Sequence, residues 1–395
     1  MIVRQITADD AAEDLKVPSL AYVWPTDLEK EEKPYAERLE TEKHIKRLGA
    51  FCNDNRTLMA RLAVLSFENN FCGTYLKSNG IGGVATRPEF RRAGAVRALF
   101  GHVFRDARED GTVLSTLYPF SFDYYRQFGY ERVTQHADFT LPFNAISHIE
   151  RSSDVKLFEG GGAADILTVY NEYASRYNMM FRRTDDSRFY KSPYTNNEYT
   201  YIWYDKSGRP ASYASYTVDG REDTVCVREV IYRDAEALRG IIGFLRCYDG
   251  NYENLRFTKL PLGSPVMDMA TEYTKIKISL TNGAAARILD LRAALEANVY
   301  PEEYGRFALR SPDDCVNGDC IFDVEYQNKK TSVSVRREGD YDISLSAAAA
   351  ARLILSGEGL TEDALQYIAG VRIKTSAADF LRAFPKRPVD LYEGF

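Results

Sequence analysis

The stretch Gly80–Arg108 reads GIGGVATRPEFRRAGAVRALFGHVFRDAR and decides the fold. Its first part, Ile81–Thr86, is short and apolar and follows Asn79-Gly80, so a turn and then a strand are predicted. After Gly94 the apolar residues recur at helical spacing, which predicts an amphipathic helix that begins between Arg92 and Gly94. The expected order is therefore strand, basic turn and helix.

Two arginines, Arg91 and Arg92, stand where this helix is expected to begin. Cations at a helix N-terminus oppose the helix dipole, so they do not stabilise the helix themselves. Together with the free backbone N–H groups of the first turn they form a site for an anion. Gly94, which lacks a Cβ, lets the backbone come close to a phosphate. A diphosphate is the expected anion, and a solvated basic turn is the alternative.

These residues resemble the acetyl-CoA loop of the GNAT N-acetyltransferases, whose signature is Arg/Gln-x-x-Gly-x-Gly/Ala. Arg91 and Gly94 match this signature, whereas Val96 stands where Gly or Ala is usual. The longer combination VATxPxxRRxG and LYPFSxxxYRxFGYE is similar to the enhanced intracellular survival (Eis) family. The resemblance implies a mixed α/β (α+β) fold, with tandem GNAT domains followed by a sterol-carrier-protein-like domain.

The length of 395 residues favours two or three domains. We expect an acetyl-CoA-binding catalytic GNAT domain at 1–150, a degenerate GNAT domain at 151–283 and a sterol-carrier-like domain at 284–395. The first domain is expected to close near Pro142, after Glu131–Leu141, and a helix at Ala284–Ala297 is expected to open the third. Where the first domain has its acetyl-CoA loop, the second has Arg233–Ala237, with two carboxylates and no glycine. That turn is expected to repel a diphosphate.

The resemblance also implies which residues hold the two substrates. Acetyl-CoA is expected to contact Val84, Ala85, Thr86, Arg91, Arg92, Ala93, Gly94 and Ala95, with strand N–H groups polarising the thioester carbonyl. The acceptor is expected to contact Tyr22, Trp24 and Phe120. Packing at the edge of a core is an equally good explanation for aromatic residues such as Tyr22 and Trp24.

Acetyl transfer also needs a proton donor and a base. By the family pattern the donor is Tyr125, although Gln127 stands where the pattern has Arg, and Tyr124 is the alternative. The base implied by the family is the terminal carboxylate of Phe395, which is a weak base unless it is buried or assisted by water. Glu393 is the alternative base, and simple packing is the alternative role of the terminal phenylalanine.

Composition limits the possible functions. A net charge of −6 argues against nucleic-acid binding, which needs a basic face. No apolar run is long enough to span a membrane, and the acidic start is unlike a secretory signal. The four histidines lack metal-ligand spacing, so no metal is expected. The six scattered cysteines are expected to be reduced, in a cytoplasmic protein.

The sequence thus predicts a cytoplasmic, acetyl-CoA-dependent N-acetyltransferase. The acceptor is expected to be an amino group of a cationic small molecule, aminoglycoside-like or a polyamine, or a lysine side chain. Transfer is expected to be direct, within a ternary complex, in a homo-oligomer that by family likeness is a hexamer. The alternative is a non-catalytic acyl-CoA sensor on the same scaffold, and a lipid carrier is a more distant one.

Overall fold

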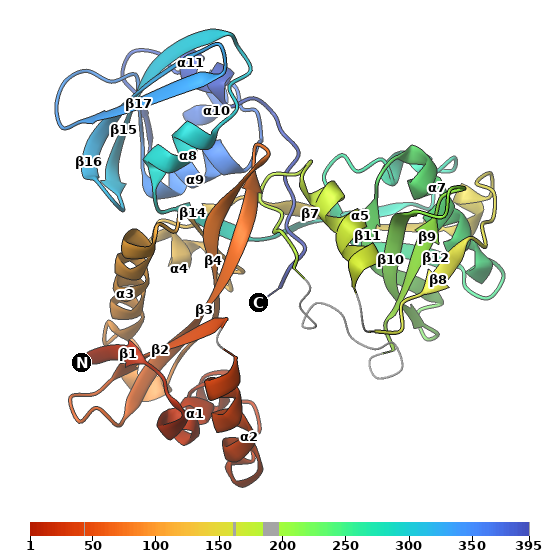
Figure 1. Ribbon diagram of the computed structural model, residues 1–395, viewed down its shortest axis with the longest axis horizontal. Coiled ribbons are helices and arrows are strands. Elements are labelled where there is room, and N and C mark those ends of the chain that lie inside the picture. The colour runs from red at the N-terminus through yellow and green to blue at the C-terminus, as the bar shows by residue number, and fades with distance from the viewer. Residues whose placement is uncertain (43, 161–162, 185–196, 395) are drawn as a thin grey trace. The chain divides into compact units, whose positions relative to one another are not determined.

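The computed structural model describes residues 1–42, 44–160, 163–184 and 197–394 (Figure 1). The chain divides into two compact units. Unit 1 comprises Met1–Val133, Ala284–Lys386 and the tail from Glu393, and unit 2 comprises Thr134–Gly283 and the tail segment Arg387–Tyr392. Each unit is thus assembled from segments that are far apart in the sequence.

Unit 1 contains a seven-stranded sheet, the first sheet, with the order β1-β2-β3-β4-β5-β14-β6. Its strands are β1 (Ile2–Gln5), β2 (Ile45–Phe51), β3 (Leu58–Phe71), β4 (Thr74–Thr86), β5 (Leu114–Leu117), β6 (Glu131–Arg132) and β14 (Ala285–Ile288). Only β4 and β5 are parallel neighbours among these described strands.

The helices of this part of unit 1 are α1 (Ala11–Tyr22), α2 (Leu28–Thr41), α3 (Ala95–Asp110) and α4 (Phe122–Arg126). α3 buries the apolar stripe that the sequence predicted, including Leu99 and Phe100, in the core of the first sheet. α1 and α2 lie together and α1 packs on β3 and β4 (Figure 1). The helix after the basic turn is therefore confirmed.

Unit 2 contains the second sheet, with the order β13-β7-β12-β11-β10-β9-β8. Its strands are β7 (Gln135–Pro142), β8 (Val155–Leu157), β9 (Tyr199–Tyr204), β10 (Pro210–Asp219), β11 (Thr224–Tyr232), β12 (Asn254–Pro261) and β13 (Lys277–Asn282), and its helices include α5 (Ala164–Ala174) and α7 (Ala235–Leu245). Again one neighbouring pair, β11 with β12, is parallel. The second sheet therefore repeats the plan of the first.

The two sheets exchange a strand. We expected the first domain to close near Pro142, after residues 131–141. These residues instead belong to two sheets, because β6 stays in the first sheet while β7 pairs with β12 and β13 in the second. Conversely, the helix expected over 284–297 is wrong in its first half, because Ala285–Ile288 forms β14 between β5 and β6. These residues are buried, and pairing with β5 outweighs the helix preference of alanine.

A third, five-stranded sheet completes unit 1, with the order β17-β16-β15-β18-β19. Its strands are β15 (Tyr304–Asp314), β16 (Gly318–Gln327), β17 (Lys330–Arg336), β18 (Ile343–Leu345) and β19 (Val371–Ile373), with helices α8 (Leu291–Ala297), α9 (Ala347–Leu355), α10 (Glu362–Leu365) and α11 (Ala378–Ala383). α9 is buried along most of its length and contacts β14 and β6 as well as β15 and β18.

The turn predicted at Asn79-Gly80 is also wrong. β4 runs straight through it, and the chain reverses earlier, at Cys72 and Gly73, which both have positive φ. Asn79 is buried and accepts a hydrogen bond from the hydroxyl of Ser115 on β5. An Asn-Gly pair can therefore continue a strand when the asparagine side chain finds a partner on the neighbouring strand.

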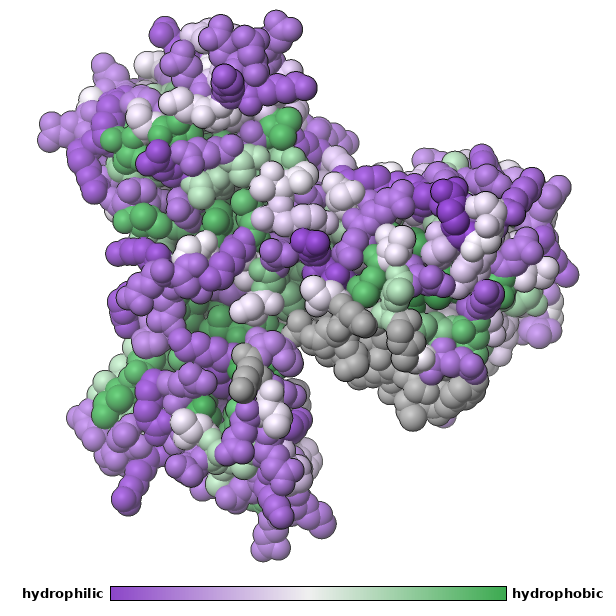
Figure 2. Space-filling model, in the orientation of Figure 1, coloured by the Kyte–Doolittle hydropathy of each residue, from purple (hydrophilic) through white to green (hydrophobic). Residues whose placement is uncertain are grey.

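The surface is mainly hydrophilic. Figure 2 shows purple, hydrophilic residues over most of the visible face, with green, hydrophobic ones in separate areas between them. Among the described residues, no helix has the length and apolarity needed to cross a bilayer. The visible face therefore offers no single extended apolar area.

Candidate active site

The candidate site lies where two parallel strands of the first sheet part. β4 and β5 pair from Ser78 with Leu114 to Ile81 with Leu117, and the pairing stops there. β4 continues to Thr86, paired only with β3 on its other side. Backbone N–H and C=O groups of the last β4 residues are thus left without a strand on one edge, and such an edge can pair with an extended ligand.

A β-bulge shapes this free edge. Arg61 pairs with Ala85 and Ala63 with Gly82, so two steps along β3 correspond to three along β4. The extra residue is accommodated at Gly83, whose φ of +56° lies in the left-handed region. Beyond the bulge β4 resumes its pairing with β3, Ala85 with Arg61 and Thr86 with Ala60, so the other edge of these residues faces the side where β5 has ended.

A cavity of about 920 Å³ opens beside this edge. Among the predicted site residues, those that line it are Tyr22, Val84, Ala85, Thr86, Arg91, Arg92, Gly94, Ala95, Phe120 and Tyr125. Ala93 and Trp24 do not line it, and Phe395 lies outside the described residues. The structure thus brings most of the predicted strand, loop and aromatic residues to one cavity.

The start of α3 is open toward an anion. Gly94 is the N-cap residue with a φ of +80°, it offers no side-chain cap, and the first turn carries no acidic residue. A Cβ at this position would meet no atom within 4 Å, so the conformation rather than the space calls for glycine. Arg92 also has a positive φ, of 65°. The N–H groups of the first turn therefore remain available beside two arginines.

Tyr125 lies among aromatic rings at the other wall of the cavity. Its ring centroid is 5.5 Å from that of Phe120 and 5.1 Å from that of Tyr124, and the side chain is almost fully buried. Burial, with smaller contributions from neighbouring tyrosines, raises the pKa of the Tyr125 hydroxyl well above its usual value. This phenol therefore keeps its proton throughout the physiological range.

Tyr22 connects the end of α1 to the free edge. Its hydroxyl donates a 2.6 Å hydrogen bond to the carbonyl oxygen of Val84. The Trp24 ring lies 5.0 Å from the Tyr22 ring and is 62% exposed. The turn between them is held by Ser19, whose backbone carbonyl and hydroxyl both bond to the Trp24 backbone. Tyr22 therefore lies at the cavity and Trp24 just outside it.

A buried polar cluster behind Gly83 was not predicted. The Asp14 carboxylate accepts a 2.5 Å hydrogen bond from the Tyr35 hydroxyl and pairs with the Arg61 guanidinium at 3.0 Å. Asp14 is fully buried, and Nη2 of Arg61 lies 3.6 Å from where a Cβ on Gly83 would stand. In the sequence, Arg61 within the apolar run of β3 was the one sign that a buried charge needed a partner. The cluster ties α1 and α2 to β3, the strand that pairs with the bulged part of β4.

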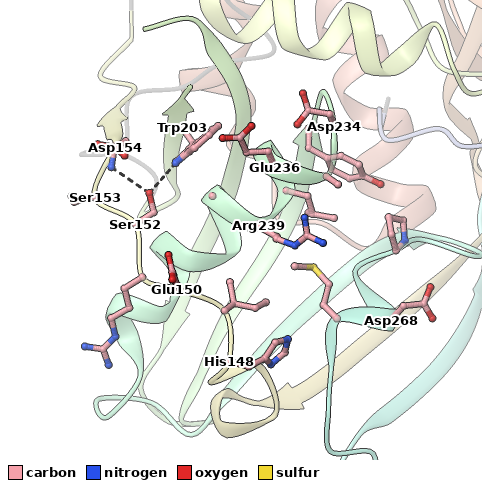
Figure 3. A pocket seen from close by; sticks show the side chains of 18 of the residues that line it. His148, Glu150, Ser152, Ser153, Asp154, Trp203, Asp234, Glu236, Arg239 and Asp268 are labelled. Carbon is pink, nitrogen blue, oxygen red and sulfur yellow. Dashed lines mark hydrogen bonds between the residues drawn. The ribbon is translucent and has the colours of Figure 1, made fainter. Parts of the chain in front are cut away.

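Unit 2 presents a different surface at the matching turn. The Asp234 side chain caps α7 by accepting a 2.9 Å hydrogen bond from the Ala237 N–H. Asp234, Glu236 and Asp268 face a cavity of about 890 Å³ that also receives Arg239 (Figure 3). A carboxylate therefore occupies the place that an anion would take at the start of α7.

The chain's own tail lies where the strands of the second sheet part. β11 and β12 stop pairing after Val227 and Phe257, and beyond that point Nζ of Lys259 donates to the Tyr392 carbonyl. The fully buried Asp390 carboxylate lies 2.7 Å from Nε2 of His136 on β7. In unit 1 the corresponding region is the 920 Å³ cavity. Unit 2 thus differs from unit 1 in two ways: the Asp234 side chain caps α7, and tail residues pack where β11 and β12 part.

The Asp14–Arg61 pair yields a stability prediction. Arg61→Met leaves the Asp14 carboxylate buried without its cation and should lower the free energy of unfolding by about 3 kcal/mol, as measured by urea denaturation. Asp14→Leu combined with Arg61→Met should recover most of that loss. The control is Arg292→Met in the exposed Arg292–Glu296 pair, which should cost less than about 1 kcal/mol. Equal losses in Arg61→Met and the control would contradict the prediction.

Family models match both segments of the chain that form the two seven-stranded sheets. Residues 3–133 and residues 174–288 each match a family model described as an acetyltransferase (GNAT) domain. No curated protein sequence matches the chain. The two family matches fall on the two sheets that share one plan.

Solved structures of similar fold cover the whole chain. They include a probable N-acyltransferase from Enterococcus faecalis (21% identity, TM-score 0.83, 100% of this chain and 99% of that chain). A GCN5-related N-acetyltransferase from Kribbella flavida gives 18% identity, a TM-score of 0.79 and 100% and 98% coverage. Eis1 from Mycobacterium abscessus gives 17% identity, a TM-score of 0.78 and complete coverage of both chains. These likenesses establish an Eis-like fold. With the two domain matches, they identify the chain as an acetyltransferase enzyme built on tandem GNAT domains.

Proposed function

We propose that unit 1 transfers the acetyl group of acetyl-CoA directly to a primary amine, within a ternary complex. The observation that carries this proposal is the free edge of β4 beside the glycine-capped start of α3, with Tyr125 on the same cavity. The acceptors implied by the sequence resemblance are an aminoglycoside-like compound, a polyamine and a lysine side chain, all of which offer such an amine.

The proposed path of acetyl-CoA follows the cavity. Its diphosphate sits at the start of α3, between the first-turn N–H groups and Arg91 and Arg92. Its pantetheine amides pair with the free edge of β4, and N–H groups among Val84, Ala85 and Thr86 polarise the thioester carbonyl. Ala93, which does not line the cavity, shapes the loop through its N–H bond to Phe90 rather than by side-chain contact.

The proposed chemistry begins with the neutral amine. Its nitrogen attacks the thioester carbon, the carbonyl oxygen gains negative charge, and collapse of this intermediate breaks the C–S bond. The thiolate takes the proton of the Tyr125 hydroxyl. Burial raises the pKa of that hydroxyl, and the same low-dielectric cavity also raises the proton affinity of the leaving sulfur, so the transfer occurs where both groups are desolvated.

The base that removes the amine proton comes from the tail in this proposal. The terminal carboxylate of Phe395 is the first candidate, from the sequence resemblance. Glu393 is the second, and it is buried and belongs to unit 1, as the cavity does. The preceding tail segment, Arg387–Tyr392, is anchored in unit 2 by the Asp390 and Tyr392 contacts.

We further propose the wider organisation that the resemblance implies. This comprises membership of the Eis family, a second GNAT domain that does not bind CoA, a sterol-carrier-like third domain, a cytoplasmic location and a hexamer of identical chains. The plan shared by the first and second sheets supports the tandem arrangement. A solution mass other than six chains would reject the hexamer.

Tyr125→Phe should lower kcat about a hundredfold, because it removes the proton donor, while leaving KM for acetyl-CoA little changed. Tyr124→Phe is the matched control and should retain activity. Release of free CoA thiol across a panel of amines measures both.

The pH dependence of kcat gives a second test. Burial raises the pKa of the Tyr125 hydroxyl, so the hydroxyl keeps its proton as the pH rises, and kcat should not fall between about pH 8 and about pH 10. Full activity of Tyr125→Phe would refute this role.

Arg91→Ala with Arg92→Ala should raise KM for acetyl-CoA at least about tenfold, because charge-assisted contacts to the diphosphate are lost far from the thioester. The control is Arg105→Ala, further along α3. Calorimetric titration should give one acetyl-CoA per chain for the unaltered protein. A second equivalent of bound acetyl-CoA would contradict the assignment of unit 2 as unable to hold it.

A chain that ends at Gly394 should bind acetyl-CoA normally but lose about a hundredfold in kcat, because the terminal carboxylate moves. Glu393→Gln in the full-length chain separates the two candidate bases. Loss of turnover only in Glu393→Gln would assign the base to Glu393, and undiminished turnover in both would remove the tail from the mechanism. If acetyl-CoA bound but no amine were acetylated, the acyl-CoA sensor would replace the enzyme.

A further inference from the structure

We infer that Arg61 is a positioning residue for acetyl transfer in unit 1, because it holds the bulged backbone of β4 whose N–H groups meet the thioester carbonyl; this inference rests on the proposed function. Arg61 does not line the cavity, so it acts through the backbone beside it. On β3 it pairs with Ala85, directly beyond the bulge. Its Nη2 atom lies 3.6 Å from where a Cβ on Gly83 would stand, which is ordinary contact distance.

The Arg61 guanidinium is fixed from two helices. α1 supplies the Asp14 carboxylate, 3.0 Å from Nη1 of Arg61, and α2 supplies the Tyr35 hydroxyl, which accepts a 3.2 Å hydrogen bond from the same nitrogen. Tyr35 in turn donates to Asp14. The Tyr35 ring also lies 5.7 Å from the guanidinium of Arg47. Because Arg47 is itself paired with Glu42 at 2.7 Å, the whole cluster is held in one arrangement.

α1 also contacts the bulge at a second point. Tyr22, the last residue of this helix, donates its hydroxyl hydrogen to the Val84 carbonyl. A bulge takes backbone groups out of the regular ladder, and this bond gives the displaced carbonyl a partner. Gly83 is thus held by Arg61 and Val84 by Tyr22, so the direction of the N–H groups that follow is fixed from α1.

Stability alone does not account for the Asp14–Arg61 pair. Asp14 is fully buried, and this burial raises the pKa of its carboxyl, so the charged form is costly to keep there. Within the described part of the chain, Oδ1 of Asp14 and Nε of Arg61 have no hydrogen-bond partner. A well-packed apolar pair is often as stable as a buried ion pair. What the ion pair adds is a rigid, planar guanidinium against Gly83.

The test is the carbonyl stretching band of acetyl-CoA, isotope-labelled at its acetyl carbonyl and bound to the protein without an amine, followed by difference infrared spectroscopy. N–H groups that polarise the carbonyl lower its stretching frequency. We expect a lowered frequency in the unaltered protein and a return toward the free value in Asp14→Leu with Arg61→Met, the double variant predicted above to regain most of its stability. Its kcat should fall at least about tenfold, with KM for acetyl-CoA little changed.

The matched control is Arg183→Met with Glu229→Leu. It removes a buried arginine–carboxylate pair of unit 2 whose carboxylate also accepts a tyrosine hydroxyl, and it should leave the band where it is. If the double variant at Asp14 and Arg61 does not fold, Arg61→Lys takes its place, because lysine keeps a cation beside Asp14 but lacks the planar guanidinium.

The outcomes separate this inference from the proposed function. A band that returns toward the free value in the Arg61 variant but not in the control supports the inference. A band that stays lowered in the Arg61 variant overturns the inference and leaves the proposed function intact. A bound carbonyl that is not polarised in the unaltered protein, or acetyl-CoA that does not bind, overturns the proposed N–H contacts and the inference together.

Discussion

The candidate active site depends on one backbone feature, the end of pairing between β4 and β5 after Ile81 and Leu117. A strand edge without a partner is normally a liability in a folded protein. In the function proposed above, the extended pantetheine arm of acetyl-CoA completes the ladder at this edge. The bulge at Gly83, the tyrosine bonded to Val84 and the buried cluster behind them all fix the geometry of that edge.

The same feature occurs twice, with different outcomes. In the second sheet β11 and β12 also part, but the side chain of Asp234 caps the following helix and tail residues pack beside the parted strands. The family matches alone would treat the two domains as equivalent. Their side chains differ at this place, which illustrates why function must be argued from the site rather than from the fold.

Local signals in the sequence predicted the secondary structure around this cavity, because the residues of the basic turn and α3 lie within one short stretch. The role of Tyr125 comes from the family resemblance and stays a prediction. The strand exchange was not predictable, because whether Gln135–Pro142 pairs with β12 depends on residues more than a hundred positions away. The Asp14–Tyr35–Arg61 cluster was missed for the same reason, since three separate elements bring it together.

The strand exchange also bears on synthesis by the ribosome. β14, an interior strand of the first sheet, is made only after nearly all of unit 2. During synthesis the edge of β5 therefore has no partner strand until residue 288 has been made. Unit 2 likewise lacks its tail segment, Arg387–Tyr392, until the rest of unit 2 and most of unit 1 have been made. Domains usually fold one after another as they are made. In this protein neither unit has all its segments until nearly the whole chain has been synthesised, so the two units complete their folds together.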